Sequence, residues 1–309
     1  MLADVLPYLA CPHCGAGLTL DGQVRCERGH GFDVARQGYV NLLSGKASVR
    51  GDSAEMVAAR AAFLDAGHYA PIMRAVAAAA GPASGCVADL GAGTGHYLAA
   101  VLDAADHETD HEAGRSAEHV AGRAAEGATG HVAGERLARE AGKLVGVALE
   151  ISKPALRRAA RAHPRAAAVG CDTWGTLPVR DRAISVALNV FAPRNPAELA
   201  RIVAADGVVV VATPATAHLA ELVAALDLLT VAPDKAQRVA EQLAPAFTVS
   251  TQDTCEYELA LSHADVVSLV GMGPSAWHVG ADALAKRVAA LHEPVRTTAS
   301  VVVTAFRRA

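Results

Sequence analysis

The sequence predicts an α/β protein in which helices cover both faces of a parallel sheet, with a small metal-binding module in front. Apolar runs of strand length alternate with helical segments, and one such run enters a glycine-rich turn. A Cys and His cluster lies within the first 30 residues. With 309 residues, 52% of them hydrophobic, the chain can bury a sizeable core as one large domain with a small addition, or as two domains.

The net charge of −4 is concentrated in one segment. Residues 103–142 hold nine acidic and four basic residues, which leaves 24 Lys and Arg against 23 Asp and Glu elsewhere. This balance gives no strong electrostatic indication of a polyanionic partner. Neither a signal peptide nor a run of about 18 apolar residues is evident, so we expect a cytoplasmic protein. In a reducing compartment, its six cysteines favour metal ligation over disulfides.

The front cluster has the spacing of a closed zinc site. Cys11, Cys14, Cys26 and His30 follow the pattern C-x2-C-x11-C-x3-H, and three thiolates with one imidazole complete a tetrahedral, structural site. His13 is a poorer ligand because its place between the first two would strain the turn. A redox role for the C-x-x-C pair leaves Cys26 and His30 unexplained. About 25 residues cannot fold around a core, so the metal supplies the folding energy.

Residues 103–142 form a compositional break that we interpret as a duplicated, disordered insertion. The tetrapeptide HVAG occurs at 119–122 and again at 131–134, and HEAG occurs at 111–114. The segment has no aromatic residue and much Ala, Gly, Glu and His, so it cannot bury enough surface to offset the entropy of ordering. The alternative is a metal-binding role for its histidines, His107, His111, His119 and His131.

The expected elements alternate along the rest of the chain. Apolar runs predict strands at 86–90, 143–151, 166–172, 183–191 and 207–213. Helices are expected at 152–164, with Ser152 as the capping residue and Pro154 near the first turn, and at 196–203. Ligands of such a sheet bind beyond the carboxyl ends of its strands.

The turn Asp89-Leu-Gly91-Ala-Gly93-Thr-Gly95 follows the first of these strands. Glycine lets the backbone approach a ligand closely because it has no Cβ and tolerates φ > 0. Dinucleotide-binding enzymes need the third glycine one residue later, and they place a helix N-terminus against a pyrophosphate. Asp89 suits a ligand that bears an amine or hydroxyls better than one that bears phosphates. The pattern resembles motif I of the S-adenosylmethionine-dependent methyltransferases, and a purely structural turn is the alternative.

Two further acidic residues end the next strands. Glu150 takes the place of the acid that accepts hydrogen bonds from the ribose hydroxyls in this enzyme class, although the spacing from Gly95 is long. Removing the insertion restores the usual spacing, which suggests that it entered a surface loop after the first helix. Asp172 resembles the position that contacts the adenine amino group, or else it only starts a turn. Asn189, Phe191 and Arg194 follow the fourth strand and are candidates for target-base contacts; the alternative is a local turn capped by Asn189.

Five segments carry a family resemblance: CPHCGAGL, CERGHGFDVARQGYVNLL, GDSAEMVAARAAFLDAGHYAP, NVFAPRNPAEL and ATPATAHLAEL. Together they resemble the bacterial 23S rRNA (guanine-N1)-methyltransferases. Within this family, the branch of the tylosin-resistance methyltransferase is most similar in the later segments SKPALRRAARAHPRA, LNVFAPRNP and VGMGPSAWH. The resemblance covers essentially the whole chain except 103–142. It implies a Rossmann-like class I S-adenosylmethionine-dependent methyltransferase fold with a small N-terminal zinc-ribbon-like domain.

The resemblance also implies an activity and roles for individual residues. The activity is methylation of N1 of a guanine in hairpin 35 of 23S rRNA, with macrolide resistance of the tylosin type as a possible outcome. A zinc-binding RNA-recognition domain (1–45), a methyltransferase domain (46–309) and a homodimer are implied as well. Cofactor contacts would come from Tyr69, Gly93, Thr94 and His218. Glu150 stands where these sequences more often have Asp.

RNA contacts are expected from two sets of basic residues. One set surrounds the zinc module (Arg25, Arg28, Arg36, Lys46 and Arg50), and the other is spaced along a helix (Arg157, Arg158, Arg161 and Arg165). The second set could equally be a solvated helix face. Two other functions therefore stay open: a small-molecule methyltransferase with a structural zinc module, and a non-catalytic zinc-ribbon RNA-binding protein.

Overall fold

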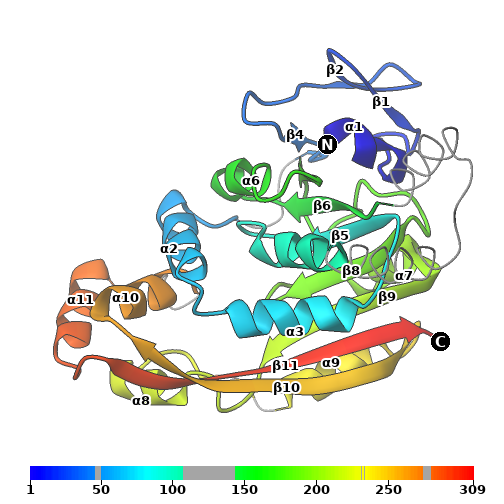
Figure 1. Cartoon of the computed structure of the whole chain (residues 1–309). Coiled ribbons are helices and arrows are strands. Elements are labelled where there is room, and N and C mark those ends of the chain that lie inside the picture. Colours follow the sequence, from blue (N-terminus) through cyan, green and yellow to red (C-terminus); the bar gives the residue numbers. More distant parts are fainter. Residues whose placement is uncertain (46–49, 107–142, 231, 233, 274–279) are drawn as a thin grey trace, which may run out of the picture.

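The computed structural model describes residues 1–45, 50–106, 143–230, 232, 234–273 and 280–309, and its main feature is an eight-stranded sheet (Figure 1). The strand order is β10 (Phe247–Leu261), β11 (Val295–Arg308), β9 (Val203–Pro214), β8 (Ile184–Val190), β5 (Cys86–Leu90), β6 (Val145–Glu150), β7 (Ala166–Gly170) and β4 (Val40–Asn41). The strands from β9 to β4 are parallel. Both β11 and β10 run antiparallel to their neighbours.

The parallel part of the sheet agrees with the sequence analysis. All five predicted strands are present, with ends that differ by a few residues. They are apolar in continuous runs because both faces are covered. Along β9, for example, Val208 and Val210 enter one hydrophobic core while Val209 and Val211 enter the other. The antiparallel edge formed by β10 and β11 was not predicted.

Helices cover both faces, as expected. The first core contains residues from α2 (Ala54–Asp65), α3 (Ala70–Ala80), the helical residues 96–106, α6 (Lys153–Ala159), α8 (Ala220–Leu226), α10 (His263–Gly271) and α11 (Ala281–Ala289). The second contains residues from α1 (Leu2–Val5), η1 (Leu6–Tyr8), α7 (Pro196–Ile202) and α9 (Lys235–Leu243). Among the described helices, none has the length and apolar character needed to cross a membrane.

The helix predicted at 152–164 is shorter than expected. Ser152 caps α6 as predicted, because its side chain accepts a hydrogen bond from the N–H of Ala155. The helix ends at Ala159, so Arg161 and Arg165 do not lie on it. Arg165 instead donates to the carbonyl of Leu144 at 2.6 Å. It also donates to the carbonyl of Leu102 and forms an ion pair with Asp106. It therefore holds the structure together, and it does not lie on the helix along which the second basic set was expected.

The first helix after β5 extends into the segment that we assigned to the insertion. Residues 103–106 complete the helix 96–106, because Leu102 packs in the core and Asp106 pairs with Arg165. Residues 107–142, including the histidines at 107, 111, 119 and 131, lie outside the described residues, as does Lys46.

The front of the chain has a small sheet of its own and also joins the large one. Its strands are β1 (Leu18–Asp21), β2 (Gln23–Cys26) and β3 (Gly31–Phe32), in an antiparallel arrangement. The chain then runs to β4, where Val40 pairs with Val169 at the edge of the large sheet. Leu9 forms a bridge with Val179. The front module thus shares the second core with the sheet.

The strand order changes direction at β5. The chain passes from β5 to β6 on one side, and after β7 it returns past β5 to form β8 on the other side, so the order of the strands reverses here. The crevice at such a switch point is where open α/β sheets bind ligands. The glycine turn lies at this end of β5.

Candidate active site and metal centre

A pocket of about 390 Å³ opens at the carboxyl ends of β5, β6 and β8. It brings together most of the predicted cofactor residues: Tyr69, Asp89, Gly91, Gly93, Thr94, Glu150 and Asp172. Gly95 and His218 do not line it. Its wall also includes Arg60, Tyr97 and Trp174, which the sequence analysis did not single out. No local motif marks these three residues.

The glycine turn needs glycine for two different reasons. Gly91, Gly93 and Gly95 all have positive φ, at 76°, 55° and 84°. A Cβ on Gly95 would lie 2.7 Å from the Cβ of Ala162, so this glycine lets the turn pack closely against the segment after α6. A Cβ on Gly91 would likewise lie 2.8 Å from the Cβ of Ala192. Gly91 and Gly93 also line the pocket, where the absence of side chains lets a ligand approach the backbone.

Asp89 ends β5 as a buried carboxyl group without its full set of partners. Its side chain is 2% exposed, and Oδ2 accepts no hydrogen bond from the described residues. Burial, and then the nearby charge of Glu150, raise the pKa of Asp89 to about 7. A buried acceptor of this kind is costly unless a donor reaches it. The geometry therefore suits a ligand with an N–H donor, above all a cationic one.

Glu150 already holds three backbone groups. Its Oε2 accepts from the N–H of Gly93 at 2.8 Å, and its Oε1 accepts from the N–H groups of Ile151 and Ser152, both at 2.8 Å. The side chain is buried at the pocket wall. The carboxylate thus joins the end of β6 to the glycine turn, and its longer side chain is what spans this distance.

Asp172 starts the local turn that was considered for it, and it also lies at the pocket. Its Oδ1 accepts from the N–H of Trp174 at 3.0 Å, which makes a local turn, and the residue also lines the pocket. Trp174 is 51% exposed at the same wall. A large exposed aromatic side chain at a pocket is a suitable surface for stacking a flat ring.

Tyr69, His218 and Phe191 form an aromatic cluster beside the pocket. The amide of Ser300 donates to Nδ1 of His218 at 3.2 Å, so in the neutral ring Nε2 carries the proton and donates to the hydroxyl of Tyr69, also at 3.2 Å. Burial, and then the charge of Lys235, lower the pKa of His218 to about 4. His218 therefore reaches the pocket through Tyr69.

Phe191 occupies an unusual backbone conformation in this cluster. Its φ of 51° is rare for a bulky residue, and 40% of its surface is exposed. The ring stacks on His218 with centroids 6.1 Å apart and also contacts Tyr69 and Tyr97. The strained turn therefore presents an aromatic face at the pocket.

The side chains of Asn189 and Arg194 form hydrogen bonds within that same turn. Asn189 is completely buried, and its amide donates to the carbonyl of Pro193 at 2.7 Å. Its Oδ1 accepts from Nε of Arg194 at 3.1 Å. The local turn considered for Asn189 is thus present, and of the three target-base candidates only Phe191 lines the pocket.

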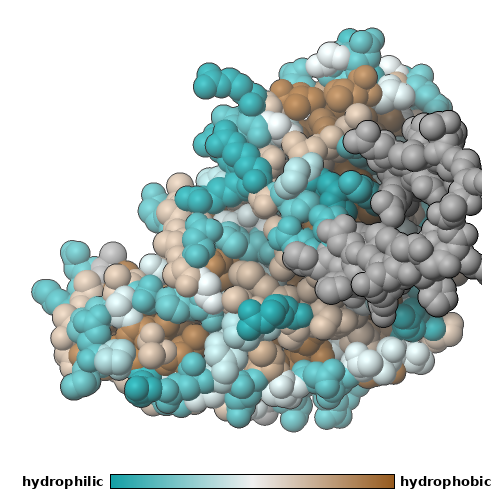
Figure 2. All heavy atoms as spheres, in the orientation of Figure 1, coloured by the Kyte–Doolittle hydropathy of each residue, from teal (hydrophilic) through white to brown (hydrophobic). Residues whose placement is uncertain are grey.

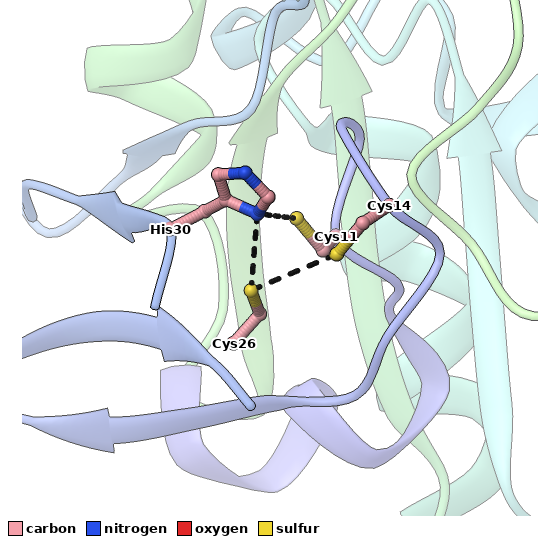
Figure 3. Close-up of side chains that lie close together, drawn as sticks. All are labelled: Cys11, Cys14, Cys26 and His30. Carbon is pink, nitrogen blue, oxygen red and sulfur yellow. Dashed lines mark hydrogen bonds between the residues drawn. The ribbon is translucent and has the colours of Figure 1, made fainter. Parts of the chain in front are cut away.

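The four predicted zinc ligands converge (Figure 3). Nδ1 of His30 lies 3.5 Å from Sγ of Cys11 and 3.3 Å from Sγ of Cys26, and the sulfur atoms of Cys14 and Cys26 are 3.8 Å apart. A tetrahedral zinc ion with Zn–S near 2.3 Å and Zn–N near 2.0 Å requires separations of about 3.5 Å for S–N and about 3.8 Å for S–S. These three separations match a tetrahedral site, and all four ligand atoms lie within 4.8 Å of one another.

His13 is not part of this cluster. Its ring stacks on Phe32, with centroids 5.7 Å apart and an interplanar angle of 12°.

Hydrogen bonds favour the thiolate form of Cys26. Burial acts to raise the pKa of its thiol, but the backbone N–H groups of His30 and Arg28 help to lower this pKa to about 6. A thiolate is the form that binds metal.

The basic residues expected to contact RNA divide into two groups. Arg25, Arg28, Arg36 and Arg50 are exposed. Arg157, Arg158 and Arg161 are exposed too, and they line a separate groove of about 790 Å³ together with His96 and Asp103. Figure 2 shows a largely hydrophilic surface where α6 lies in the same view.

Comparison with known proteins shows relatives over nearly the whole chain. The 23S rRNA (guanine(748)-N(1))-methyltransferase of Streptomyces fradiae is 46% identical, with 99% of both chains covered. A homologue from Micromonospora griseorubida is 45% identical, again over 99% of both chains. The chain belongs to the 23S rRNA (guanine-N1)-methyltransferase family. The family model described as "RlmA, N-terminal", a zinc ribbon, matches residues 9–47 of this methyltransferase.

Solved structures give a more distant likeness. A chain in the complex between the Haloferax volcanii Trm112 methyltransferase activator and a methyltransferase has 16% identity to this methyltransferase and a TM-score of 0.47. The match covers 84% of this chain and 99% of that one.

The cofactors of this methyltransferase are S-adenosylmethionine and zinc, and the residues present fit both. Asp89 offers a buried acceptor for the α-ammonium group, and the glycine turn leaves room for close backbone approach. At the front, three thiolates and one imidazole form a donor set that suits zinc and leaves no position open for catalysis.

Proposed function

We propose that this methyltransferase transfers the methyl group of S-adenosylmethionine to N1 of a guanine in hairpin 35 of 23S rRNA, at the position numbered 748. The observation that carries the proposal is the 46% identity to the Streptomyces fradiae enzyme, whose name gives this guanine. S-adenosylmethionine supplies an electrophilic methyl group on a sulfonium centre. The protein's task is to align the two reactants and to exclude water.

We further propose a role for each side of the pocket. Asp89 and the turn at Gly93 and Thr94 hold the amino-acid part of the cofactor, Glu150 accepts from the ribose with its remaining acceptor capacity, and Asp172 accepts from the adenine amino group. Tyr69 contacts the cofactor, and His218 orients Tyr69 through the hydrogen bond between Nε2 and the hydroxyl.

The target base needs a surface on which to stack once it leaves its loop. Phe191 supports this role best, because its ring is exposed at the pocket and held by Tyr97 and His218 on other sides. N1 of guanine also carries a proton at neutral pH, which a carboxylate, a histidine or water must accept.

RNA binding requires contacts beyond the pocket. We propose that residues 1–45 act as an RNA-holding module and that residues 46–309 form the catalytic part. Arg157, Arg158 and Arg161 line a groove next to the catalytic pocket, since Thr94 belongs to both linings. Phosphates of the hairpin flanks are suitable ligands for these guanidinium groups.

Primer extension tests the activity directly. Methylation at N1 blocks Watson–Crick pairing, so reverse transcriptase should stop one nucleotide before position 748 after incubation with enzyme and S-adenosylmethionine. A transcript with adenine at position 748 is the matched control and should give no stop. A stop elsewhere, or methyl incorporation only into small molecules, would show that the proposed target is wrong.

Two consequences belong to the same proposal. A methyl group beside the macrolide-binding tunnel should lower susceptibility to tylosin, which can be measured as the inhibitory concentration for a sensitive host that expresses the gene. We also propose a homodimer, and light scattering on the purified protein will give its mass.

A further inference from the structure

The side chain of Arg60 lies next to the glycine turn at the pocket. It belongs to α2, and a Cβ on Gly93 would lie 3.2 Å from its Nη1 and 3.5 Å from its Cδ. The side chain is 24% exposed and lines the pocket together with Asp89. A guanidinium group is thus held over the backbone that the cofactor approaches.

Two partners fix the position of this guanidinium. Nη1 forms an ion pair with Asp52, and Nη2 donates to the carbonyl of Met272 at 2.8 Å. Asp52 is itself anchored, because its carbonyl accepts from the hydroxyl of Ser152 at 2.8 Å. A guanidinium has five N–H donors, so these two partners leave donors for a further acceptor.

The charges around the pocket indicate which group of the cofactor the guanidinium of Arg60 would bind. Its lining holds four carboxylates (Asp52, Asp89, Glu150 and Asp172) and two basic side chains, Arg50 and Arg60. The methionyl part of the cofactor carries both an ammonium and a carboxylate. Asp89 suits the ammonium, whereas a carboxylate entering this acidic surrounding requires a cation.

We propose that Arg60 binds the α-carboxylate of S-adenosylmethionine. Arg60 is the better candidate of the two arginines because its guanidinium is fixed at the turn, whereas Arg50 is an exposed residue on the loop before α2. A fixed fork of N–H donors binds a carboxylate with little loss of side-chain entropy. Arg60 then binds the carboxylate of the amino-acid part, and Asp89 binds its ammonium group.

This inference rests on the cofactor of the proposed function but not on its RNA target, so it can be tested without RNA. Calorimetry on the full-length protein would compare the affinity for S-adenosylmethionine with that for decarboxylated S-adenosylmethionine, which lacks only the carboxylate. For the unmodified protein we expect about 10- to 100-fold weaker binding of the decarboxylated form. If neither ligand binds, the proposed function fails together with this inference.

Three variants distinguish the contribution of Arg60 from that of the other pocket residues. Arg60→Met should bind both ligands with the affinity that the unmodified protein has for the decarboxylated form. Arg60→Lys keeps the charge and should retain part of the preference, about 3- to 10-fold. Arg50→Gln tests the other arginine of the lining and should keep the full preference if Arg60 is the group that binds the carboxylate.

The affinity for decarboxylated S-adenosylmethionine also reports whether the pocket of each variant is intact. Should Arg60→Met fail to fold, the partial loss in Arg60→Lys decides the matter. Two outcomes would overturn the proposal. One is that Arg60→Lys, and Arg60→Met if it folds, still prefer S-adenosylmethionine over the decarboxylated form as strongly as the unmodified protein does. The other is that only Arg50→Gln loses this preference.

Discussion

The backbone N–H of Gly93 donates to Oε2 of Glu150 at 2.8 Å, which ties the turn after β5 to the end of β6. Since Oε1 of the same carboxylate accepts from the first two residues after β6, one side chain fixes both loops of the pocket. A glutamate in place of the more usual aspartate therefore has a structural explanation in this chain.

Glu150→Asp should destabilise the protein. The shorter side chain cannot reach Gly93 and Ser152 together, so at least one buried N–H loses its partner. We expect the free energy of unfolding to fall by about 1–2 kcal/mol, as measured by urea denaturation. Glu258→Asp, at an exposed position on β10, is the control and should change it by less than about 0.5 kcal/mol. Equal effects of the two substitutions would contradict this role of Glu150.

The buried carboxyl of Asp89 should make the cofactor-free protein less stable as the pH rises. Its folded-state pKa of about 7 lies above the ordinary value of 3.8, so the stabilisation is complete below pH 3.8 and is lost as the pH rises through 7. Between pH 5 and 8, the loss should be about 2–3 kcal/mol. Asp89→Asn should remove this part of the pH dependence in urea denaturation. Identical pH profiles for the two proteins would show that Asp89 is not the group responsible.

Loss of zinc should affect the front module more than the pocket. The double variant Cys11→Ser, Cys14→Ser should contain no zinc by atomic emission and should melt at a lower temperature, because the metal supplies folding energy. No described residue before Arg50 lines the pocket, so cofactor affinity should change by less than about threefold. If cofactor affinity falls in parallel with zinc content, the division between the two parts is wrong.

The groove formed by Arg157, Arg158 and Arg161 should contribute phosphate contacts. Replacing all three with Gln should weaken binding of the hairpin and reduce the slope of log K against log salt by about 2. Filter binding at several salt concentrations will measure both quantities. Arg296→Gln, an exposed arginine paired with Glu258 on β10, is the control and should leave the slope unchanged. An unchanged slope in the triple variant would assign these residues to a solvated surface.

Phe191→Leu should weaken catalysis more than cofactor binding. Leucine keeps much of the apolar volume but offers no face for stacking, and the loss of one base stack costs about 1–3 kcal/mol. We therefore expect kcat/KM for rRNA to fall by about 5- to 100-fold, with cofactor affinity within threefold of the original. A loss of cofactor affinity as large as the loss of kcat/KM would place Phe191 against the cofactor instead.

Local patterns predicted the parts of the molecule that depend on neighbouring residues. The apolar runs around Asp89 and Glu150, the cap at Ser152 and the spacing of the four zinc ligands are all short-range signals, and the structure has each of them. The glycine turn is of the same kind, because its backbone conformation is set within seven residues.

Contacts between distant segments could not be predicted in this way. Tyr257 and Ala299 pair although the described helices α10 and α11 lie between them in the sequence, so nothing near either residue indicates the antiparallel edge. Arg60 lies far from Gly93 in the sequence. Arg165 has the same charge as the nearby arginines of α6, but its side chain donates to a backbone carbonyl. Only the fold distinguishes these residues from solvated ones.

The pairing of β4 with β7 affects the order in which the protein can assemble during synthesis. Val40 leaves the ribosome early, but its partner Val169 emerges only after the glycine turn and the whole of β6. Until then the strand has no sheet to join, and long-range pairing of this kind is slow. A metal-bound ribbon that folds without the rest of the chain would keep this segment out of wrong pairings, so zinc supply during translation should influence the yield of correctly folded protein.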